Sequence, residues 1–337
     1  MPTPQETLSP LPVRAIRESP LPNPHSPPPP MTRYLIKRIL AGLFTIWITT
    51  IAVTLLIHLV PGDPVQIMYA QSQSTTPEQL EQIRRNLGLD RPIYEQYFLY
   101  MSRILRGDFG TTIRGSQPVF DLLMVRLPNT LLLALSSLLI TMVVGVTAGF
   151  FAAYKRGTWL DTLLMTGSII GISIPSFWLG LMLIYVFSIR LGWFPVSGTN
   201  LPNLVLPAIT LGLANAASVA RLTRSSMIDV LSQDYMRTAR AKGLQETIVL
   251  SRHAFRNGMI NVVNMLGLQF TYMMGGAIVV ENVFAWNGIG RLAIQSIFQR
   301  DYPTIQGFIL IFATVVVLVS IFLDLIYVWI DPRITYR

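Results

Sequence analysis

Residues 234–250 read DYMRTARAKGLQETIVL, and they form the longest polar interruption in the hydrophobic second half of the chain. They lie inside a basic segment, 221–256, which we interpret as a loop between two membrane spans. Gly243 stands where a glycine commonly follows a helix C-terminus, and a second helical run is expected at 245–255. A helix–glycine–helix unit between two spans indicates a surface presented to a soluble partner. The alternative is a plain solvated connector.

Side-chain size and polarity favour the ordered unit. Ser232 or Asp234 can cap the first helix, because their oxygens accept hydrogen bonds from free backbone N–H groups. Ala239 and Ala241 are small residues beside a sharp turn, and a solvated connector has no need of them. We therefore expect two short helices here.

The composition indicates a polytopic membrane protein. Of the 337 residues, 51% are hydrophobic and only 13% are charged, whereas a soluble domain has about 25% charged residues. Half that share, with long charge-free runs, is typical of chains with several membrane spans. The chain has no cysteine, which excludes disulfides and thiolate metal sites.

Six apolar runs separate the charged segments. About 20 residues cross the hydrocarbon core, so the runs predict an all-α polytopic membrane protein with six transmembrane helices. Pro175 lies in the middle of the third run and should kink it, because proline removes a backbone donor. The runs are 39–60, 130–154, 163–189, 204–220, 259–280 and 305–323.

The distribution of basic residues predicts the topology. With the N-terminus inside, 14 Lys and Arg flank the cytoplasmic ends of the runs, and three lie in the two short outer loops. The positive-inside rule therefore favours an N-in, C-in orientation. The net charge of +9 is then a topology signal, and we expect no nucleic-acid partner.

Residues 1–30 contain 11 of the 23 prolines and no apolar run. Such a segment lacks the apolar core of a signal peptide and should be a disordered, Pro-rich tail. Two alternatives are open: a genuine tail, or translation that starts at Met31. We favour the second, and we expect residues 1–30 to be dispensable.

The segment 61–129 has seven basic and seven acidic residues, as suits an exported insertion between the first two spans. Thr76, a proline and Gln79 match a capping box with proline at the first helical position, so a helix should run from there to Leu87. A second, amphipathic helix is expected at 92–106. A structured exported segment suits the docking of a soluble protein, or it closes the outer mouth.

Enzyme motifs are absent from the sequence. There is no GxxxxGK[ST] phosphate loop and no HExxH or GxSxG motif, and the three histidines are scattered, so we assign no catalytic and no metal-ligating residue. The predicted spans lack ionisable residues except for Asp324, near the inner end of the last span. We expect Asp324 to pair with a cytoplasmic arginine. The lack of charged groups in the spans argues against a proton- or sodium-coupled carrier, because such a carrier usually places charged groups at mid-membrane.

Uncharged polar residues on the fourth and fifth spans are the candidates for a transport pathway. Polar groups in a membrane helix need partners, so they should face other helices or a wet cavity. Interhelical hydrogen bonding and a substrate path both remain open. The candidates are Asn215, Ser218, Asn261, Asn264, Gln269 and Tyr272.

The run Arg237-Thr-Ala-Arg-Ala-Lys-Gly243 resembles the EAA loop of ATP-binding-cassette (ABC) importer permeases. More narrowly, the chain from about residue 31 to 337 resembles the dipeptide/oligopeptide permease family, which includes glutathione and nickel systems, in its first-permease (B-type) branch. Asn261 and Asn287 stand where that family commonly has proline. The further matching segments are Pro61-Gly-Asp-Pro64, Leu87-Gly-Leu-Asp-Arg-Pro92, Gly107-Asp-Phe-Gly110, 281–292, Asp301-Tyr-Pro303 and 331–334.

The resemblance implies a type I ABC importer permease fold in a bacterial inner membrane. After the tail 1–30 would come an N-terminal segment with the first span at 31–60 and the exported helical insertion at 61–129. The core, 130–337, would carry spans two to six and the cytoplasmic coupling loop 221–256.

The resemblance also implies partners and roles. These are a second related permease, two ABC ATPases that bind ATP and magnesium, an extracytoplasmic substrate-binding protein and membrane lipid; the chain itself would need no cofactor. The small Ala239 would let an ATPase backbone approach, and Gly243 would turn the chain with positive φ. The residues assigned to ATPase coupling are Asp234, Tyr235, Arg237, Thr238, Ala239, Arg240, Ala241, Lys242, Gly243 and Leu244.

The implied function is ATP-driven import of di- or oligopeptides, or of a glutathione-like peptide, with hydrolysis carried out by the partner subunits. A permease of the same family for nickel or another small solute is the alternative within this class. An autonomous channel or an ion-coupled carrier is the alternative from another class.

Overall fold

The computed structural model describes residues 31–59, 65, 76–87, 90–113, 115–198 and 200–330. The predicted tail 1–30 and the motifs at 61–64 and 331–334 lie outside the described residues. Every regular element of the described part is a helix. The helices are α1 (Met31–Leu59), α3 (Pro77–Leu87), α4 (Ile93–Ile104), α5 (Val119–Tyr154), α6 (Trp159–Ser173), α7 (Ser176–Leu183), η1 (Ile184–Arg190), α8 (Leu201–Leu231), α9 (Asp234–Ala241), α10 (Glu246–Ile248), η2 (Val249–Phe255), α11 (Arg256–Val283), α12 (Ile289–Gln299) and α13 (Tyr302–Ile330).

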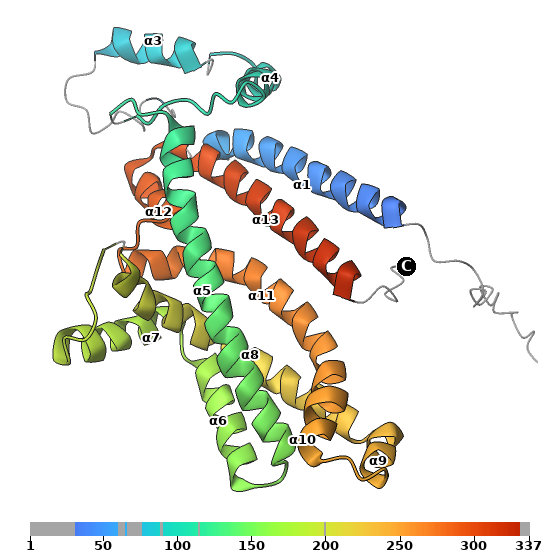
Figure 1. The fold of residues 1–337 in the computed structure, drawn as a ribbon. Helices are drawn as coiled ribbons and strands as arrows, with labels where there is room; N and C mark the ends of the chain where they lie inside the picture. Colours follow the sequence, from blue (N-terminus) through green and yellow to red (C-terminus); the bar gives the residue numbers. More distant parts are fainter. Residues whose placement is uncertain are drawn as a thin grey trace, which may run out of the picture.

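Five helical segments are long and apolar enough to cross a membrane, and a sixth span results if α6 and α7–η1 count as one. The predicted bend at Pro175 is confirmed, but it is a sharp break and not a small kink. Its two arms meet at 102° around Pro175, and Figure 1 shows α7 turning sharply away from α6. The residue before the proline, Ile174, is extended with ψ 121°, because the proline ring disfavours helical geometry there.

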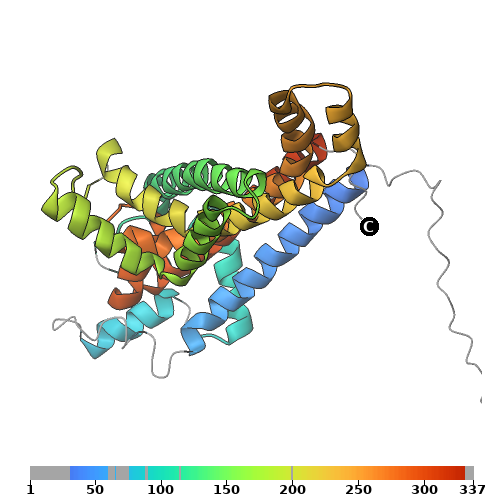
Figure 2. The same ribbon diagram turned by 90° about the horizontal axis from the view of Figure 1, so that it is seen from below.

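The centre of the bundle is the pair α5 and α8, which cross in close contact (Figures 1 and 2). A Cβ added to Gly145 would lie 2.8 Å from the carbonyl oxygen of Ala216, and one added to Gly149 would come still closer to that of Ala220. Glycines four residues apart let two membrane helices approach through their backbones. The Thr141 hydroxyl also donates to the carbonyl oxygen of Gly212 at 2.7 Å.

Helix α11 packs on α8 and α5 and completes the core. Leu211 of α8 and Leu133 of α5 belong to one buried cluster with Met273 and Ala277 of α11 and with Trp286 beyond its end.

Helices α1 and α13 lie side by side along their length (Figure 1). Arg38 of α1 forms an ion pair with Asp324 of α13, which confirms that Asp324 pairs with an arginine near the N-terminal segment. At the other end, the side-chain amide of Gln306 donates to the carbonyl oxygen of Val53 at 3.1 Å. These two contacts hold the pair together at both ends.

The described part of the segment between α1 and α5 has the two helices that the sequence predicts. The backbone N–H of Thr76 donates to the Gln79 side-chain oxygen at 2.9 Å, and the N–H of Gln79 reaches the Thr76 hydroxyl at 3.4 Å, so the capping box is confirmed. Helix α3 ends at Leu87 as expected. Helix α4 is slightly shorter than predicted, because Pro92 precedes it and the turn to Gly107, with φ +78°, follows it.

We predict that Gly149→Leu disrupts the α5–α8 contact, because the leucine side chain would collide with backbone atoms of α8. Overpacking of this kind costs about 1–3 kcal/mol or more. Gly167→Leu is the matched control, since a Cβ at this helical glycine meets nothing within 4 Å. Fluorescence-detected size exclusion after heating should show a lower unfolding temperature for Gly149→Leu alone. Equal unfolding temperatures would contradict the close-contact interpretation.

Candidate functional site

The basic segment 221–256 is helical for most of its length and contains the predicted helix–glycine–helix unit, as α9, Gly243 and α10–η2. Helix α8 continues to Leu231, and the run predicted at 245–255 passes through α10 and η2 into α11 without a break. The long apolar spans on both sides propagate helix into the polar segment, because helix extension costs little once a nucleus exists. Only residues 232–233 and 242–245 turn the chain around α9.

The ends of α9 differ in how well the sequence predicts them. Neither Ser232 nor Asp234 caps its start: the Ser232 hydroxyl donates back to Asp229 at 2.7 Å, and Asp234 is already the first helical residue. There its carboxylate still suits the positive end of the helix dipole. At the other end Gly243 has φ +75°, and its N–H donates to the carbonyl oxygen of Arg240 at 2.9 Å. The left-handed glycine is therefore confirmed.

One face of α9 is buried inside the chain itself. Met236 is fully buried and Ala239 is 7% exposed. Both lie in a cluster, which we call the α9 cluster, with the following side chains of α5, α8 and η2: Ala153, Met227, Val249 and Ala254. The expectation that Ala239 is small so that an ATPase can approach it is corrected. Its small side chain lets α9 pack on η2 and the end of α5.

The other face of α9 is solvated and rich in positive charge. The exposed residues are Asp234, Tyr235, Arg237, Thr238, Arg240, Ala241, Lys242, Gly243 and Leu244. The Arg240 guanidinium pairs with Glu246 of α10 at 2.9 Å, and this hydrogen bond raises the pKa of Arg240 above its usual value. Tyr235 accepts a hydrogen bond from the Asn257 amide at 3.0 Å. Nine of the ten residues assigned to coupling thus share one accessible surface.

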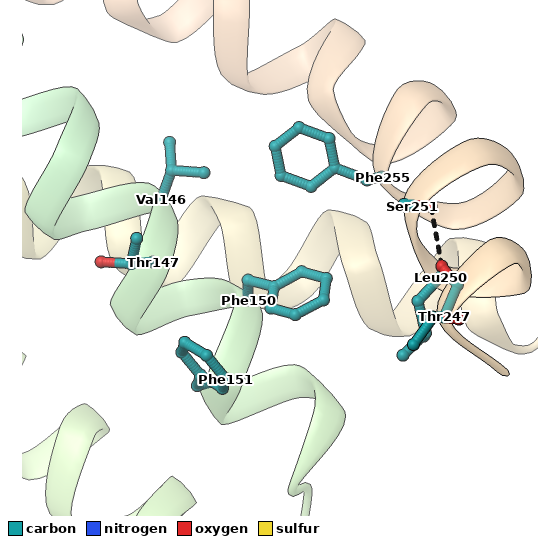
Figure 3. Close-up of a pocket in the computed structure, with 8 residues that line it drawn as sticks. All are labelled: Val146, Thr147, Phe150, Phe151, Thr247, Leu250, Ser251 and Phe255. Carbon is teal, nitrogen blue, oxygen red and sulfur yellow. Dashed lines mark hydrogen bonds between the residues drawn. The ribbon is translucent and has the colours of Figure 1, made fainter.

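A groove of about 470 Å³ lies between α5 and the α10–η2 segment. Figure 3 shows Phe150 and Phe151 on one wall, with Phe255 and Leu250 facing them across the opening. The Phe150 and Phe255 rings meet edge to face, with centroids 6.0 Å apart. Short π-helical turns such as η2 are frequently found at functional sites. Helix η2 contributes residues both to the wall of the groove and to the α9 cluster.

The structure brings together two of the six pathway candidates through a hydrogen bond that spans two helices. The Gln269 amide of α11 donates to the Asn215 side-chain oxygen of α8 at 3.3 Å. Ser218 and Asn264 are half-buried. Asn261 and Tyr272 are exposed on the outer face of α11.

A buried carboxylate organises the end of the bundle next to α12. It is not among the candidate residues that we named from the sequence. Glu281, at the end of α11, is fully buried. It accepts hydrogen bonds from the Thr130 hydroxyl of α5 and, at 2.9 Å, from the backbone N–H of Arg291. Gly288 lies so close to this carboxylate that a side chain there would collide with it. The motif 281–292 is therefore the end of a helix and the turn to α12, built around this carboxylate.

Asn287, which replaces a commonly found proline, also has a structural role. Its carbonyl oxygen accepts a hydrogen bond from the Asn129 amide of α5 at 2.8 Å. The Trp286 indole N–H donates to the carbonyl oxygen of Asn129 at 3.0 Å. The turn is thus tied to α5 by two hydrogen bonds. At the other departure, Asn261, helix α11 continues without interruption.

Among the described residues, no group of three or more His, Asp or Glu side chains is placed to hold a metal ion. The accessible features are a solvated helical hairpin, an apolar groove beside it and polar side chains within an apolar bundle. This combination of fold and site defines the membrane-embedded subunit of a transport system that works with soluble partners.

Comparison with known proteins assigns the family. Residues 145–336 match the model described as "Binding-protein-dependent transport system inner membrane component", and residues 31–134 match its N-terminal companion. The chain belongs to this family. It is therefore a multi-pass transport subunit of a bacterial inner membrane and not an enzyme. It is the membrane component of an ABC importer, a system that also has ATPase and substrate-binding components.

Two relatives and one solved structure illustrate the similarity. The chain is 45% identical over 308 residues to the glutathione transport system permease protein GsiC of Escherichia coli K12 and of Shigella flexneri, which covers 91% of this chain and 100% of theirs. The structure of the MetNI methionine ABC transporter in inward-facing conformations matches with 18% identity and a TM-score of 0.54. The match covers 62% of this chain and 96% of the MetNI chain, and it supports the type I permease fold.

We predict that Gly243→Val abolishes most transport, because a β-branched residue in left-handed geometry costs about 1–2 kcal/mol or more. A Cβ at this position meets nothing within 4 Å, so the effect must come from the backbone. Gly243→Asn is the matched control, since asparagine tolerates this conformation. Uptake into cells should stay near the parental rate for Asn and fall for Val. A Val variant that transports normally would show that the turn is not needed.

Proposed function

We propose that this chain is one of two permease subunits of an importer for short peptides, with a glutathione-like peptide as the preferred substrate. The observation that carries the proposal is the 45% identity, over the whole length of the relative, to permeases named for glutathione transport. The uncharged polar residues along α8 and α11 are compatible with a zwitterionic peptide, because they offer hydrogen bonds without a fixed charge.

The outer face of α9 is the proposed seat of an ATPase subunit. Its exposed charges, including Arg237 and Lys242, orient the contact, and the ATPases bind the ATP and magnesium. Movement of α9 passes to η2 through the α9 cluster, in which Met236 and Ala239 contact residues of η2. Because η2 continues directly into α11, a displacement of α9 shifts a membrane span.

The outer face of α11 is the proposed contact with the second permease and the wall of the pathway. Asn261, Leu268, Tyr272 and Val279 are all exposed and lie on one side of the helix, given their spacing of seven, four and seven residues. Lipid offers no hydrogen-bond partner to Asn261 and Tyr272. A related helix from the second permease, or a wet pathway between the two, provides one.

The proposal places α9 and both termini on the cytoplasmic side, with the exported helices α3 and α4 on the side of the substrate-binding protein. The excess of Lys and Arg beside the cytoplasmic ends supports this orientation. Asn215, Ser218, Asn264 and Gln269 then lie between the two sides, within reach of a substrate that enters from outside.

We predict that the double variant Arg237→Glu/Lys242→Glu weakens ATPase binding at least about tenfold, or about 1.4 kcal/mol, because it reverses two exposed charges of the contact. Arg106→Glu, an equally exposed reversal in the exported segment, should leave binding unchanged. Co-purification of the ATPases at graded salt measures the effect. Parental binding by the double variant would remove α9 from the ATPase contact.

We expect cells that carry the complete transporter to take up labelled glutathione and to lose this uptake when unlabelled short peptides compete. Deleting the permease should reduce the uptake to background. Nickel uptake without glutathione uptake would replace the peptide assignment with the metal-solute alternative of the same family. It would leave the ATPase contact at α9 untouched.

A further inference from the structure

Helix α4 carries an apolar stripe that the described residues leave uncovered. Tyr94, Phe98 and Leu105 are 63%, 68% and 80% exposed. Their spacing of four and seven residues places them on one side of the helix; Leu105 keeps helical geometry at its end. A contiguous row of large apolar side chains indicates a contact surface.

The two contacts between α1 and α13 mark the boundaries of the membrane on this pair. Arg38 and Val53 are 15 residues apart on α1, and Gln306 and Asp324 are 18 residues apart on α13. At 1.5 Å per residue these intervals are about 22 and 27 Å, close to the ~30 Å of a hydrocarbon core. The Arg38–Asp324 ion pair suits the inner boundary, and the Val53–Gln306 hydrogen bond suits the outer one.

Helix α4 is attached to α1 at this outer boundary. The Tyr97 hydroxyl lies 3.2 Å from the Thr50 hydroxyl, within the apolar span Leu35–Leu55. Thr50 is three residues below Val53, which is about 4.5 Å along the helix. Figures 1 and 2 both show α4 beside the half of α1 that leads to Leu59. Helix α4 therefore lies at the level of the membrane interface.

The stripe adjoins the contact with α1. Phe98 follows Tyr97 directly, and the two rings meet edge to face with centroids 5.8 Å apart. Tyr94 precedes Tyr97 by nearly one helical turn. Arg103 lies on the opposite side of α4, and Glu95 and Arg106 lie between the two sides, by helical periodicity. The neighbouring surface of α1 at this height is also apolar, with exposed Trp47, Ile48 and Leu55. The surface that lipid covers on α1 thus continues onto α4.

We propose that α4 is an interfacial membrane helix whose stripe Tyr94–Phe98–Leu105 is buried in the outer leaflet. Amphipathic helices lie with their apolar face about 5–10 Å deep in the boundary between headgroups and acyl chains, which agrees with the Thr50 contact. Aromatic side chains are enriched at this level. The basic residues Arg91 and Arg106, just outside the two ends of α4, then meet lipid phosphates. This inference goes beyond the proposed transport function, and it assigns the stripe to lipid and not to the substrate-binding protein.

The chain has no cysteine, so each introduced cysteine gives a single labelling site. Phe98→Cys and Leu105→Cys probe the stripe, and Arg103→Cys, at an exposed position on the opposite side, is the matched control. All three carry a nitroxide label in the assembled transporter, with cysteine-free partners, in vesicles of phosphatidylethanolamine and phosphatidylglycerol. Electron paramagnetic resonance then compares collisions with oxygen, which concentrates in the bilayer, and with a water-soluble nickel chelate.

The oxygen-to-nickel collision ratio should be several-fold higher at positions 98 and 105 than at position 103, and adding the substrate-binding protein should not change it. A higher nickel collision rate at the stripe would place it in water and overturn the proposal. Protection from both reagents would assign the stripe to a protein contact. If that protection requires the binding protein, the stripe is its docking surface. Co-purification of the ATPases confirms that every variant is assembled.

Discussion

The close backbone contact between α5 and α8 is the constraint on which the rest of the structure depends. Gly145 and Gly149 allow the two helices to touch through the carbonyl groups of Ala216 and Ala220. Lipid is as apolar as the side chains it replaces, so this contact must come from packing and hydrogen bonds. It brings the ends of both helices, Ala153 and Met227, into the cluster that supports α9.

The α5–α8 pair is a fixed frame, and α11 spans its two ends. At one end η2 joins α11 to the α9 cluster through Val249 and Ala254. At the other end Glu281 ties α11 to Thr130 of α5 and to the turn before α12. A buried carboxylate is costly unless it is hydrogen-bonded, and these donors meet that requirement. The proposed coupling uses this arrangement, since α11, like α5, reaches from the α9 hairpin to the turn before α12.

In the described part of the chain, helix α4 is linked to this frame through α1 and the segment before α5. Helix α4 contacts α1 through Thr50 and Tyr97, and α1 in turn packs on α13. A helix at the membrane interface would hold the exported segment at a fixed height, so that a binding protein meets the same outer surface at each encounter. The lipid contact of α4 and the ATPase contact of α9 would then lie at opposite boundaries of the membrane.

The sequence by itself determined the features that depend on chain neighbours. Apolar runs of sufficient length predict the spans, Thr76 and Gln79 predict a helix start, and Gly243 predicts a left-handed turn, because each signal acts over a few residues. Only the tertiary structure decided which side of α9 is free. Ala239 faces inward because Val249 and Ala254 lie against it, and no local pattern specifies such a neighbour. The same holds for Glu281, whose polar partners come from another helix, and for the 102° break at Pro175, where the angle depends on how each arm packs.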